Sequence, residues 1–416
     1  MRRQSATRLV CALGLLLAVA GCARTPQPPP AISAAALALQ PWANVVDRAR
    51  GSVVIWRMWR GDPAINAYID GWVAPRMLAE YGIEVRAVDG LGAELVNTLV
   101  TERDARGNAS GTASLMWING ETYAQLRRES LLAGPWTASL PNSRLVDMDS
   151  PIIGRDFEQD PSGFESPWGT VQFALIYDAT RTPDPPRTID ALAEWIRAHP
   201  GRFTHDQQFT GITFLKTLMY GLSGGVSSFQ GGFNDDRYRA GRDRLFAWLD
   251  DVRPSFWRGG ETYPPDVAAM HRLFANGEID FTMSNNQNEV VTKVRQGILP
   301  PDSRALLLEE GTIANAHYLG IPYNAPNAAG AMVLANFLLS PDAQLEKQRG
   351  DVWGDGTVLD LTTLPDPWPA RFQEAMDDAG ALPREALAAG ARPEVHPLYH
   401  TRLLDDWRQG IRSGTP

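Results

Sequence analysis

The sequence predicts an α/β protein built from two lobes. A chain of 416 residues is too long for one core of ordinary size. Short apolar segments typical of strands alternate with amphipathic segments typical of helices, which is the pattern of sheets covered by helices. A polar stretch over residues 141–166 interrupts this alternation, which then resumes. We therefore expect two α/β lobes with mixed, mostly parallel sheets and a hinge between them.

The first lobe is predicted to begin with three strands, each followed by a helix. The strands are expected at 52–58, 83–88 and 113–117. Asp62-Pro63 is typical of a helix start, because an acidic N-cap precedes a proline at the first helical position. Pro75 has no amide hydrogen, so we expect it to kink or break the helix that ends at Gly82. This order of elements predicts parallel strands joined by right-handed crossovers.

The second lobe is predicted to begin with a strand at 170–178. Apolar residues at helical spacing indicate helices at 189–198, 211–222 and 265–275, and apolar runs indicate strands near Phe203 and at 278–283. The chain is then expected to return to the first lobe through residues 319–322. Asn327 is a typical N-cap for the apolar helix that follows.

The first 21 residues have the features of a secretory signal peptide. Three arginines precede an apolar run over Leu9–Ala20, which is too short to span a bilayer. The run ends in the sequence LAVAGC at residues 17–22, which resembles a bacterial lipobox. We therefore expect cleavage after residue 21 and lipidation of Cys22, whose acyl chains would anchor the protein stably. The alternative is an ordinary secretory signal with a chance cysteine.

Composition limits what the mature chain is expected to do. Residues 22–41 are rich in Pro and Ala and are predicted to form a tether, so that the folded part starts near Trp42. Signal removal would leave 36 basic and 48 acidic side chains, an acidic balance that argues against nucleic-acid binding. Cys22 would be the only cysteine, too few for a disulfide framework or a Cys-rich metal site. We expect a lipid-anchored monomer on the periplasmic side of a bacterial membrane.

Two polar segments directly follow predicted strands of the first lobe. In open α/β sheets, ligands bind beyond the carboxyl ends of the strands, where helix N-termini expose N–H groups. The candidate ligand-binding residues here combine aromatic faces with polar groups, and they are Trp59, Arg60, Gly61, Asp62, Trp117, Asn119, Gly120 and Glu121. The alternative is that both tryptophans cap the core and that Asp62 only caps its helix.

The second lobe and the connecting segments supply further candidates. Gly211 opens an apolar helix, permits close backbone approach, and leaves a helix N-terminus that would favour an anionic group on a ligand. Two Asn pairs are also consistent with plain turns, because Asn tolerates unusual backbone angles. The remaining candidates are Trp168, Gly169, Thr210, Gly211, Trp257, Arg258, Asn285, Asn286, Asn315 and His317. Trp168→Ala is expected to weaken ligand binding more than it lowers the melting temperature of the ligand-free protein.

The sequence argues against an enzyme and against a bound cofactor or metal. Residues 221–225 match the G-x-S-x-G pattern of serine hydrolases, with Ser223 as the nucleophile. That pattern requires a strand before the serine and a helix after it, whereas an apolar helix is predicted to precede Ser223. His396 and His400 are the only histidines four residues apart, and Pro397 makes a helical metal pair doubtful. A lipoprotein hydrolase stays the distant alternative.

The chain resembles the solute-binding components of ABC importers and, within them, the YnjB-type family. The matching stretches run nearly through the mature chain: Trp59–Asp62, Leu115–Glu121, Glu165–Gly169, Phe209–Gly211, Trp257-Arg258, Asn336–Gln344 and Val352–Asp355. One departure is Trp59-Arg60-Gly61, where the family usually has Trp-Gly-Gly. Arg60 would narrow the cleft or add a cation to it.

The resemblance implies the type II fold of periplasmic binding proteins, in which the chain crosses between lobes more than once. Crossings are expected near residues 150–165, near 300–312 and near 353. These place lobe 1 at 42–154 and 312–352, and lobe 2 at 155–311 and 353–416. The resemblance also implies a membrane permease and a cytoplasmic ATPase as partners. A solute sensor for a chemoreceptor or kinase, built on the same fold, is the alternative.

The candidate residues limit the class of solute. Four tryptophans offer flat faces, two arginines and two acids offer both charges, and amides complete the set. Hard metal ions prefer several carboxylates and zinc prefers His or Cys, so a free metal ion is not expected. A small organic solute that carries both charges, or a neutral polar one with a flat face, fits best.

Overall fold

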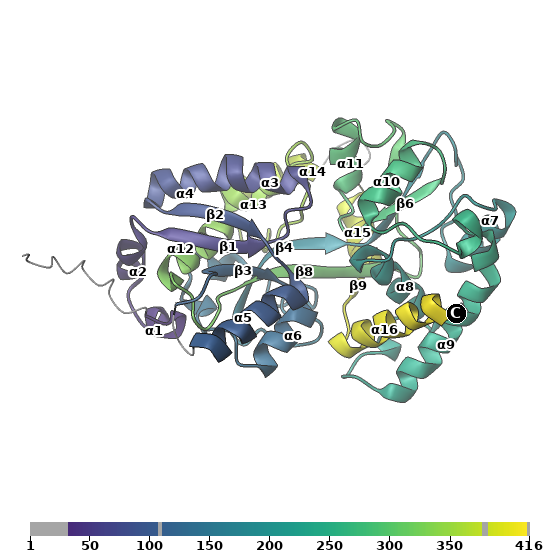
Figure 1. The fold of residues 1–416 in the computed structure, drawn as a ribbon. Coiled ribbons are helices and arrows are strands. Elements are labelled where there is room, and N and C mark those ends of the chain that lie inside the picture. Colours follow the sequence, from purple (N-terminus) through teal and green to yellow (C-terminus); the bar gives the residue numbers. More distant parts are fainter. Residues whose placement is uncertain (1–31, 107–109, 377–381, 414–416) are drawn as a thin grey trace, which may run out of the picture. The chain divides into compact units, whose positions relative to one another are not determined.

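The computed structural model describes residues 32–106, 110–376 and 382–413, and Figure 1 shows their arrangement. The predicted signal peptide at 1–21, Cys22 and the tether as far as residue 31 lie outside these ranges. Across the part of the chain that is described, no helix has both the length and the apolar character needed to cross a membrane.

The folded part begins earlier than the sequence predicts. Ser33 caps helix α1 (Ala34–Ala38), and α2 (Trp42–Ala49) follows after a short turn. Ala34 and Leu37 are fully buried, because both helices pack against α12 (Ala328–Leu338). The prediction of a tether as far as residue 41 is therefore wrong for residues 33–41.

A six-stranded sheet forms the centre of the first lobe. Its strands are β1 (Val53–Met58), β2 (Glu84–Asp89), β3 (Leu115–Ile118), β4 (Glu165–Gln172), β8 (Thr312–Gly320) and β9 (Ala391–Pro393). The order is β2-β1-β3-β8-β4, with β9 beside β8. β1, β2 and β3 are parallel, as predicted, whereas β8 runs antiparallel to β3 and β4.

Helices cover both faces of this sheet. They are α3 (Pro63–Tyr68), α4 (Ala74–Tyr81), α5 (Gly92–Arg106), α6 (Gly120–Arg128), α12, α13 (Pro341–Gln348) and α14 (Trp368–Met376). The apolar side chains of α3, α4 and α12 share one core with β1, and those of α5 and α6 share another with β3 and β8. Pro75 does not break its helix, because a π-helical turn at Ile69–Val73 joins α3 to α4.

The second lobe has its own sheet and its own core. Its strands are β5 (Ala174–Asp178), β6 (Phe281–Ser284) and β7 (Ser303–Leu306), in the antiparallel order β6-β5-β7. Its helices are α7 (Ile189–Ala198), α8 (Phe209–Leu222), α9 (Asp235–Val252), α10 (Val267–Ala275), α11 (Glu289–Arg295), α15 (Arg384–Gly390) and α16 (Pro397–Ser413). The strand expected near Phe203 does not form, although Phe203 is fully buried in this core.

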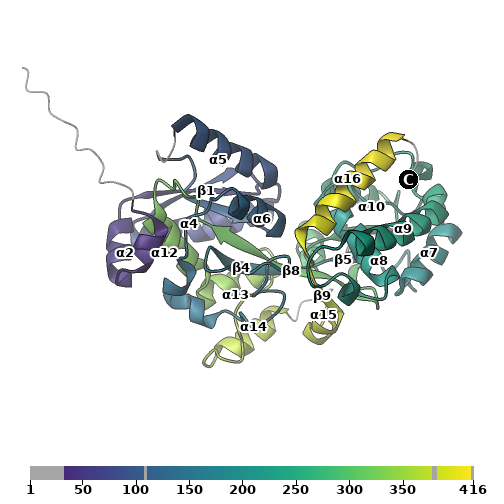
Figure 2. The same cartoon turned by 90° about the horizontal axis from the view of Figure 1, so that it is seen from below.

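The two-lobed α/β class with mixed sheets is confirmed, and the chain crosses between the lobes inside strands. β4 and β8 pair side by side over most of their length, as Figure 2 also shows. Trp168 and Leu319 belong to the first core, whereas Phe173 and Ile313 belong to the second. These crossings therefore lie within or next to the paired strands rather than in the loops at 150–165 and 300–312.

The third crossing lies later than residue 353. Trp353, Leu364 and Phe372 pack in the first core, whereas Val395 and Tyr399 pack in the second. The chain therefore changes lobes between α14 and α15. An apolar segment packs in whichever core lies beside it in the folded chain, and the sequence alone does not show which core that is.

Candidate binding cleft

Asp62 lies where the two lobes meet. Its carboxylate accepts a hydrogen bond from the Ala64 amide at 2.7 Å, which caps α3 as the sequence predicts. The other oxygen lies 2.6 Å from the Nζ of Lys293, on α11 of the second lobe. Asp62 therefore joins the lobes as well as capping its helix. Lys293 was not predicted as a site residue.

Lys293 belongs to a buried charged network of the second lobe. Its Nζ lies 3.6 Å from Glu289, and the Glu289 carboxylate lies 3.7 Å from the Nε2 of His271. Burial acts to raise the pKa of Glu289, but His271, Lys293 and Ser284 together lower it to about 2. Burial likewise acts to lower the pKa of Lys293, but Glu289 and Asp62 outweigh burial and raise it. The network thus keeps Lys293 charged and directed at Asp62.

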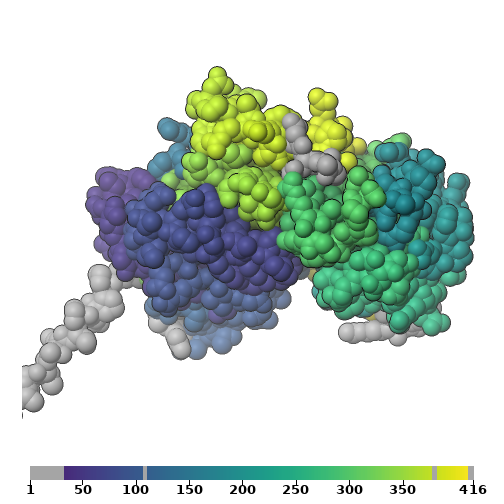
Figure 3. All heavy atoms as spheres, turned by 90° about the horizontal axis from the view of Figure 1, so that it is seen from above, coloured from purple at the N-terminus to yellow at the C-terminus, as the bar shows by residue number. Residues whose placement is uncertain are grey.

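Helix α11 also contacts the first lobe through neutral groups. Asn288 Nδ2 donates to the Gly354 carbonyl at 3.0 Å, and the Thr292 hydroxyl donates to the Gly350 carbonyl at 3.0 Å. Figure 3 shows the green region of the second lobe lying against the yellow-green region of the first lobe. These neutral hydrogen bonds and the Asp62–Lys293 ion pair therefore connect the lobes on the side of α11.

Trp59, Arg60 and Gly61 follow β1, as predicted. Trp59 is 40% exposed, and its ring lies so close to Gly61 that a Cβ there would be 2.6 Å from ring atoms. The Arg60 guanidinium forms two hydrogen bonds with the Asp70 carboxylate, at 3.1 and 2.5 Å. Arg60 is therefore already paired inside its own lobe, and Trp59 keeps an accessible face.

Trp117, Trp168 and His317 come together from β3, β4 and β8. The ring centroids of Trp117 and Trp168 are 5.0 Å apart, and that of His317 lies 4.7 Å from Trp117 and 5.0 Å from Trp168. Trp353 packs on the same group. Trp168 is fully buried. In this conformation it packs in the core beneath β4 and β8, called the hinge strands below, and has no surface for a solute.

Gly169 lies in the hinge strand where no side chain fits. A Cβ there would be 2.0 Å from the His317 ring and 2.1 Å from the Asp355 carboxylate. Asp355 in turn lies 3.1 Å from the His317 Nε2 and 2.8 Å from the Lys347 Nζ. Lys347 and Asp355 have no exposed side-chain surface, and burial lowers the pKa of Lys347 despite the opposing effect of Asp355. This buried pair was missed by sequence reasoning, because its members lie at an ordinary helix end and in a turn.

The burial of Trp168 changes the expected effect of its truncation. Trp168→Ala should lower the free energy of unfolding by about 3–5 kcal/mol, because it leaves a large cavity between Trp56, Trp117 and Trp353. Chemical denaturation of the solute-free protein measures this loss. A loss below about 1 kcal/mol, with binding still impaired, would support the solute contact predicted from the sequence instead.

The second-lobe candidates are brought together only in part. Asn285 Nδ2 donates to the Thr210 hydroxyl at 3.0 Å, which joins the end of β6 to the start of α8. Asn286 accepts from the Asn288 amide at 2.9 Å, which is a turn contact. Gly211 is needed because a Cβ there would lie 1.8 Å from the Asp206 carbonyl oxygen.

The start of α8 is not free for an anion. The Asp206 carboxylate accepts a hydrogen bond from the Gln208 amide at 2.7 Å. Burial raises the pKa of Asp206, against the effect of the Gln208 and Gly211 amides. An acid of this chain already occupies the N-terminus of α8, so the predicted preference for an anionic solute group at Thr210-Gly211 is wrong.

Trp257 and Arg258 make their contacts inside the second lobe. The Arg258 guanidinium lies 4.1 Å from the Trp257 ring centroid, and the Trp257 amide donates to the Phe203 carbonyl. Asn315 lies half-buried on β8, opposite Val171 of β4. Asn315 is thus on the hinge strand, whereas Trp257 and Arg258 lie at the edge of the second core.

Asn119, Gly120 and Glu121 form the start of α6, as predicted. The Phe157 ring packs directly on Gly120, where a Cβ would lie 2.2 Å from ring atoms. Glu121 lies 3.6 Å from the Nε2 of His400, on α16 of the second lobe. Burial raises the pKa of Glu121, although Lys216 partly opposes this. Glu121 therefore reaches the second lobe.

Phe157 and Glu158 connect the lobes on this side. Both residues have positive φ angles, of 49° and 62°, which is strained for side chains of this size. The Glu158 carboxylate accepts hydrogen bonds from the amides of Gly231 and Gly232, at 3.0 and 3.1 Å. Lys216 Nζ lies 4.9 Å from the Phe157 ring centroid. Two sets of contacts, one around Asp62 and one around Glu158, thus bridge the lobes.

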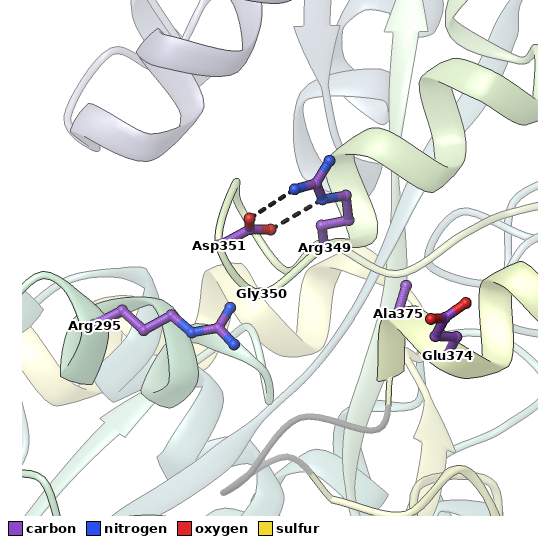
Figure 4. Close-up of a pocket in the computed structure, with 6 residues that line it drawn as sticks. All are labelled: Arg295, Arg349, Gly350, Asp351, Glu374 and Ala375. Atoms are coloured by element: carbon purple, nitrogen blue, oxygen red, sulfur yellow. Dashed lines mark hydrogen bonds and ion pairs between the residues drawn. The ribbon is translucent and has the colours of Figure 1, made fainter.

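Figure 4 shows a polar hollow that contains none of the predicted solute-binding residues. Its volume is about 300 Å³, and its lining residues are Arg295, Arg349, Gly350, Asp351, Glu374 and Ala375. Arg349 forms two hydrogen bonds with Asp351, at 3.0 and 2.6 Å. Arg349 and Asp351 are thus occupied with each other, which makes this hollow a weaker candidate than the region between the lobes.

The structure does not support a hydrolase centred on Ser223. Ser223 is the C-cap of α8, so a helix and not a strand precedes it. Its hydroxyl has no hydrogen-bond partner within the described ranges, and a nucleophilic serine requires an adjacent base. Those ranges also contain no group of three or more His, Cys, Asp or Glu side chains arranged to hold a metal ion.

Comparisons with known proteins agree with this architecture. The profile of the family described as bacterial extracellular solute-binding protein matches residues 73–370. Protein YnjB of Escherichia coli (strain K12) is 37% identical over 369 residues, which cover 88% of this chain and 92% of YnjB.

Solved structures share the fold at low sequence identity. AfuA from Actinobacillus pleuropneumoniae superposes with a TM-score of 0.59 at 14% identity, covering 87% of this chain and 99% of AfuA. PotD from Streptococcus pneumoniae gives 0.60 at 15% identity, covering 86% and 99%. HitA from Pseudomonas aeruginosa gives 0.57 at 16% identity, covering 85% and 99%. The family match and the YnjB match place this chain among the bacterial extracellular solute-binding proteins.

Proposed function

We propose that this protein is the solute-binding component of an ABC importer. It captures a small polar organic solute between its lobes and delivers it to a membrane permease driven by a cytoplasmic ATPase. AfuA is described with fructose-6-phosphate, PotD as a spermidine/putrescine binder and HitA with iron. Since one fold serves such different solutes, the class of solute must be argued from the cleft of this chain.

One observation carries this proposal. Each lobe has its own hydrophobic core, and the lobes touch through side chains at two places that flank the paired strands β4 and β8. On one side Asp62 pairs with Lys293, and on the other Glu158 binds the amides of Gly231 and Gly232. Opening would break these polar contacts and leave both cores intact, which is the requirement for hinge closure on a solute.

Solution scattering tests the closure. Wild-type protein is expected to show a smaller radius of gyration after addition of the low-molecular-weight fraction of yeast extract. Lys293→Met should start with a larger radius, because it removes the cation that holds Asp62 across the cleft. Arg197→Met is the matched control, since Arg197 pairs with Asp251 inside the second lobe. Equal radii for the wild type and Lys293→Met, with and without the extract, would contradict hinge closure.

The anchoring proposal concerns Cys22, which lies outside the described residues. Cys22→Ser is expected to release the mature protein into the soluble fraction, because the variant has no thiol for the acyl chains. High-salt washing of membranes followed by immunoblotting measures the release. Cys11→Ser, within the predicted signal peptide, is the matched control and should stay with the membranes. Membrane association of Cys22→Ser after the wash would show that the lipobox interpretation is wrong.

An uptake assay separates an importer from a sensor on the same fold. A strain that lacks this protein is expected to lose uptake of the solute it binds. Unchanged uptake together with a lost chemotactic or kinase response would assign the protein to sensing.

A further inference from the structure

Five buried polar residues from both lobes form a cluster between α6, β4, α8 and α16. The first lobe contributes Asp156 and Glu165, and the second contributes Glu394, Tyr220 and His400. Each of the five is more than nine-tenths buried. This group, called the interlobe cluster below, lies next to the predicted site residue Glu121 and to Phe157, both of which contact His400.

Negative charge exceeds positive charge in the interlobe cluster. The only cation that pairs directly with it within the described chain is Lys216, whose Nζ bonds to the Oε1 of Glu394 at 2.5 Å. Arg127 lowers the pKa of Glu165 from a distance, but its guanidinium stacks on the Phe164 ring at 3.5 Å. Burial, Lys216 and Arg408 lower the pKa of His400 well below its ordinary value, so His400 is neutral. Three carboxyl groups thus share one direct cation.

Few hydrogen-bond donors reach the carboxyl groups. Asp156 and Glu165 hydrogen-bond to each other, which requires a shared proton, and the amides of Gly120 and Val395 lower the pKa values of Asp156 and Glu394. No other donor among the described residues reaches these two acids or the Oε2 of Glu394. Burial raises the pKa of Asp156 and of Glu165, and each is raised further by a second acid, Glu394 and Asp156 respectively. In the solute-free protein, bound protons must therefore neutralise Asp156 and Glu165 in place of a cation.

Two side chains of other types give an independent indication of a ligand. The hydroxyl of Tyr220 and the Nδ1 of His400 are buried and have no partner among the residues that the structure describes. Tyr220 lies one turn after Lys216 on α8, and its pKa is raised by burial and then by Glu394. Buried polar groups without partners are uncommon in native proteins, and a bound molecule is one way in which their missing hydrogen bonds are supplied.

We propose that the interlobe cluster binds the positively charged, hydrogen-bond-donating end of the solute, with Asp156 and Glu165 on one lobe and Glu394 on the other. This inference rests on the proposed function of solute capture and specifies the solute as an ammonium, amidinium or guanidinium compound. An ammonium group offers three donors and a guanidinium group five, matching a site that consists almost wholly of acceptors. Because the acids come from both lobes, the cation stabilises the closed form, and it releases protons when it binds.

Fractionated yeast extract tests the charge of the solute. The extract is separated into the fraction retained by a cation exchanger, the fraction retained by an anion exchanger and the unretained fraction. Only the cation-retained fraction is expected to raise the melting temperature of wild-type protein, by at least about 2 °C. Asp156→Asn/Glu165→Gln should reduce that shift at least fivefold, while Asp251→Asn, an exposed acid of the second lobe, should keep it.

The possible outcomes separate the inference from the proposed function. A shift from the anion-retained or unretained fraction alone would overturn the inference and leave solute capture intact. An unchanged shift in Asp156→Asn/Glu165→Gln would also overturn it. No shift from any fraction would count against solute capture itself and against the inference with it. Glu394→Gln provides a second variant if the double variant does not melt cooperatively.

Discussion

Lys347→Met is expected to lower the free energy of unfolding by about 3–5 kcal/mol. Lys347 and Asp355 lie 2.8 Å apart with no exposed side-chain surface, so removing the ammonium leaves the Asp355 carboxylate buried without its cation. Lys347 also donates to the carbonyl of Gly356, which lies beside the hinge strand β4. The loss is large because water cannot reach the carboxylate. Urea denaturation monitored by tryptophan fluorescence measures it.

A second variant shows whether the uncompensated charge is the cause. Asp355→Asn in the Lys347→Met background removes the buried charge and should restore at least half of the lost stability. His317 Nε2, 3.1 Å from Asp355, remains a partner for the amide. If the double variant is no more stable than Lys347→Met, the loss comes from packing around Lys347 and not from the unpaired carboxylate.

Asp156→Asn/Glu165→Gln is expected to stabilise the solute-free protein by about 1–4 kcal/mol at pH 8 and to flatten its dependence on pH. Burial is the main cause that raises both carboxyl pKa values, and the neighbouring acids raise them further. The amides keep the volume and remove the cost of burying charge. They can also hydrogen-bond to one another, since each amide has a donor and an acceptor.

The sign of the pH dependence follows from these raised pKa values. The folded protein holds the carboxyl protons over a pH range in which the unfolded chain, with ordinary pKa values of about 4, has released them. Folding therefore takes up protons, and this contribution to stability is complete below pH 4. The contribution is lost as the pH rises through the folded-state pKa values.

Guanidinium denaturation between pH 4 and pH 9 measures this dependence. The difference in stability between the double variant and the wild type should increase with pH. Asp251→Asn should follow the wild type, because Asp251 is an exposed acid paired with Arg197. A constant difference across this range would mean that Asp156 and Glu165 do not titrate differently in the folded and unfolded states.

Local signals in the sequence predicted most of the elements of both lobes. Helix α7 starts after Thr188 and spans Ile189–Ala198, the predicted range, because its cap and its apolar spacing are contained within ten residues. Asp62-Pro63 starts α3 for the same reason. The prediction failed at residues 33–41, where the Ser33 cap and the Ala/Leu run after it were interpreted as part of the tether, although they form α1 and pack on α12. Pro75 was also misjudged, because a π-helical turn satisfies the backbone around it.

The sequence predicted candidate site residues in the polar segments that directly follow a strand. Asp62 after β1 and Glu121 after β3 do contact the second lobe, since the carboxyl ends of parallel strands meet at one edge. Lys293, Asp156, Glu165 and Glu394 were missed. Each lies in a segment whose local pattern is that of a surface helix or a polar loop, and nothing near it in the sequence indicates burial.

The sequence by itself determined the α/β class, the two lobes and the family, because these depend on patterns within ten to twenty neighbouring residues. Only the tertiary structure decided which charges meet. Asp62 and Lys293 are 231 residues apart in the chain, and Lys216 and Glu394 are 178 apart, yet each pair is in direct contact. The free energy of a charge depends on the partners and the water around it, and the paired crossings of β4 and β8 bring those partners together from distant segments.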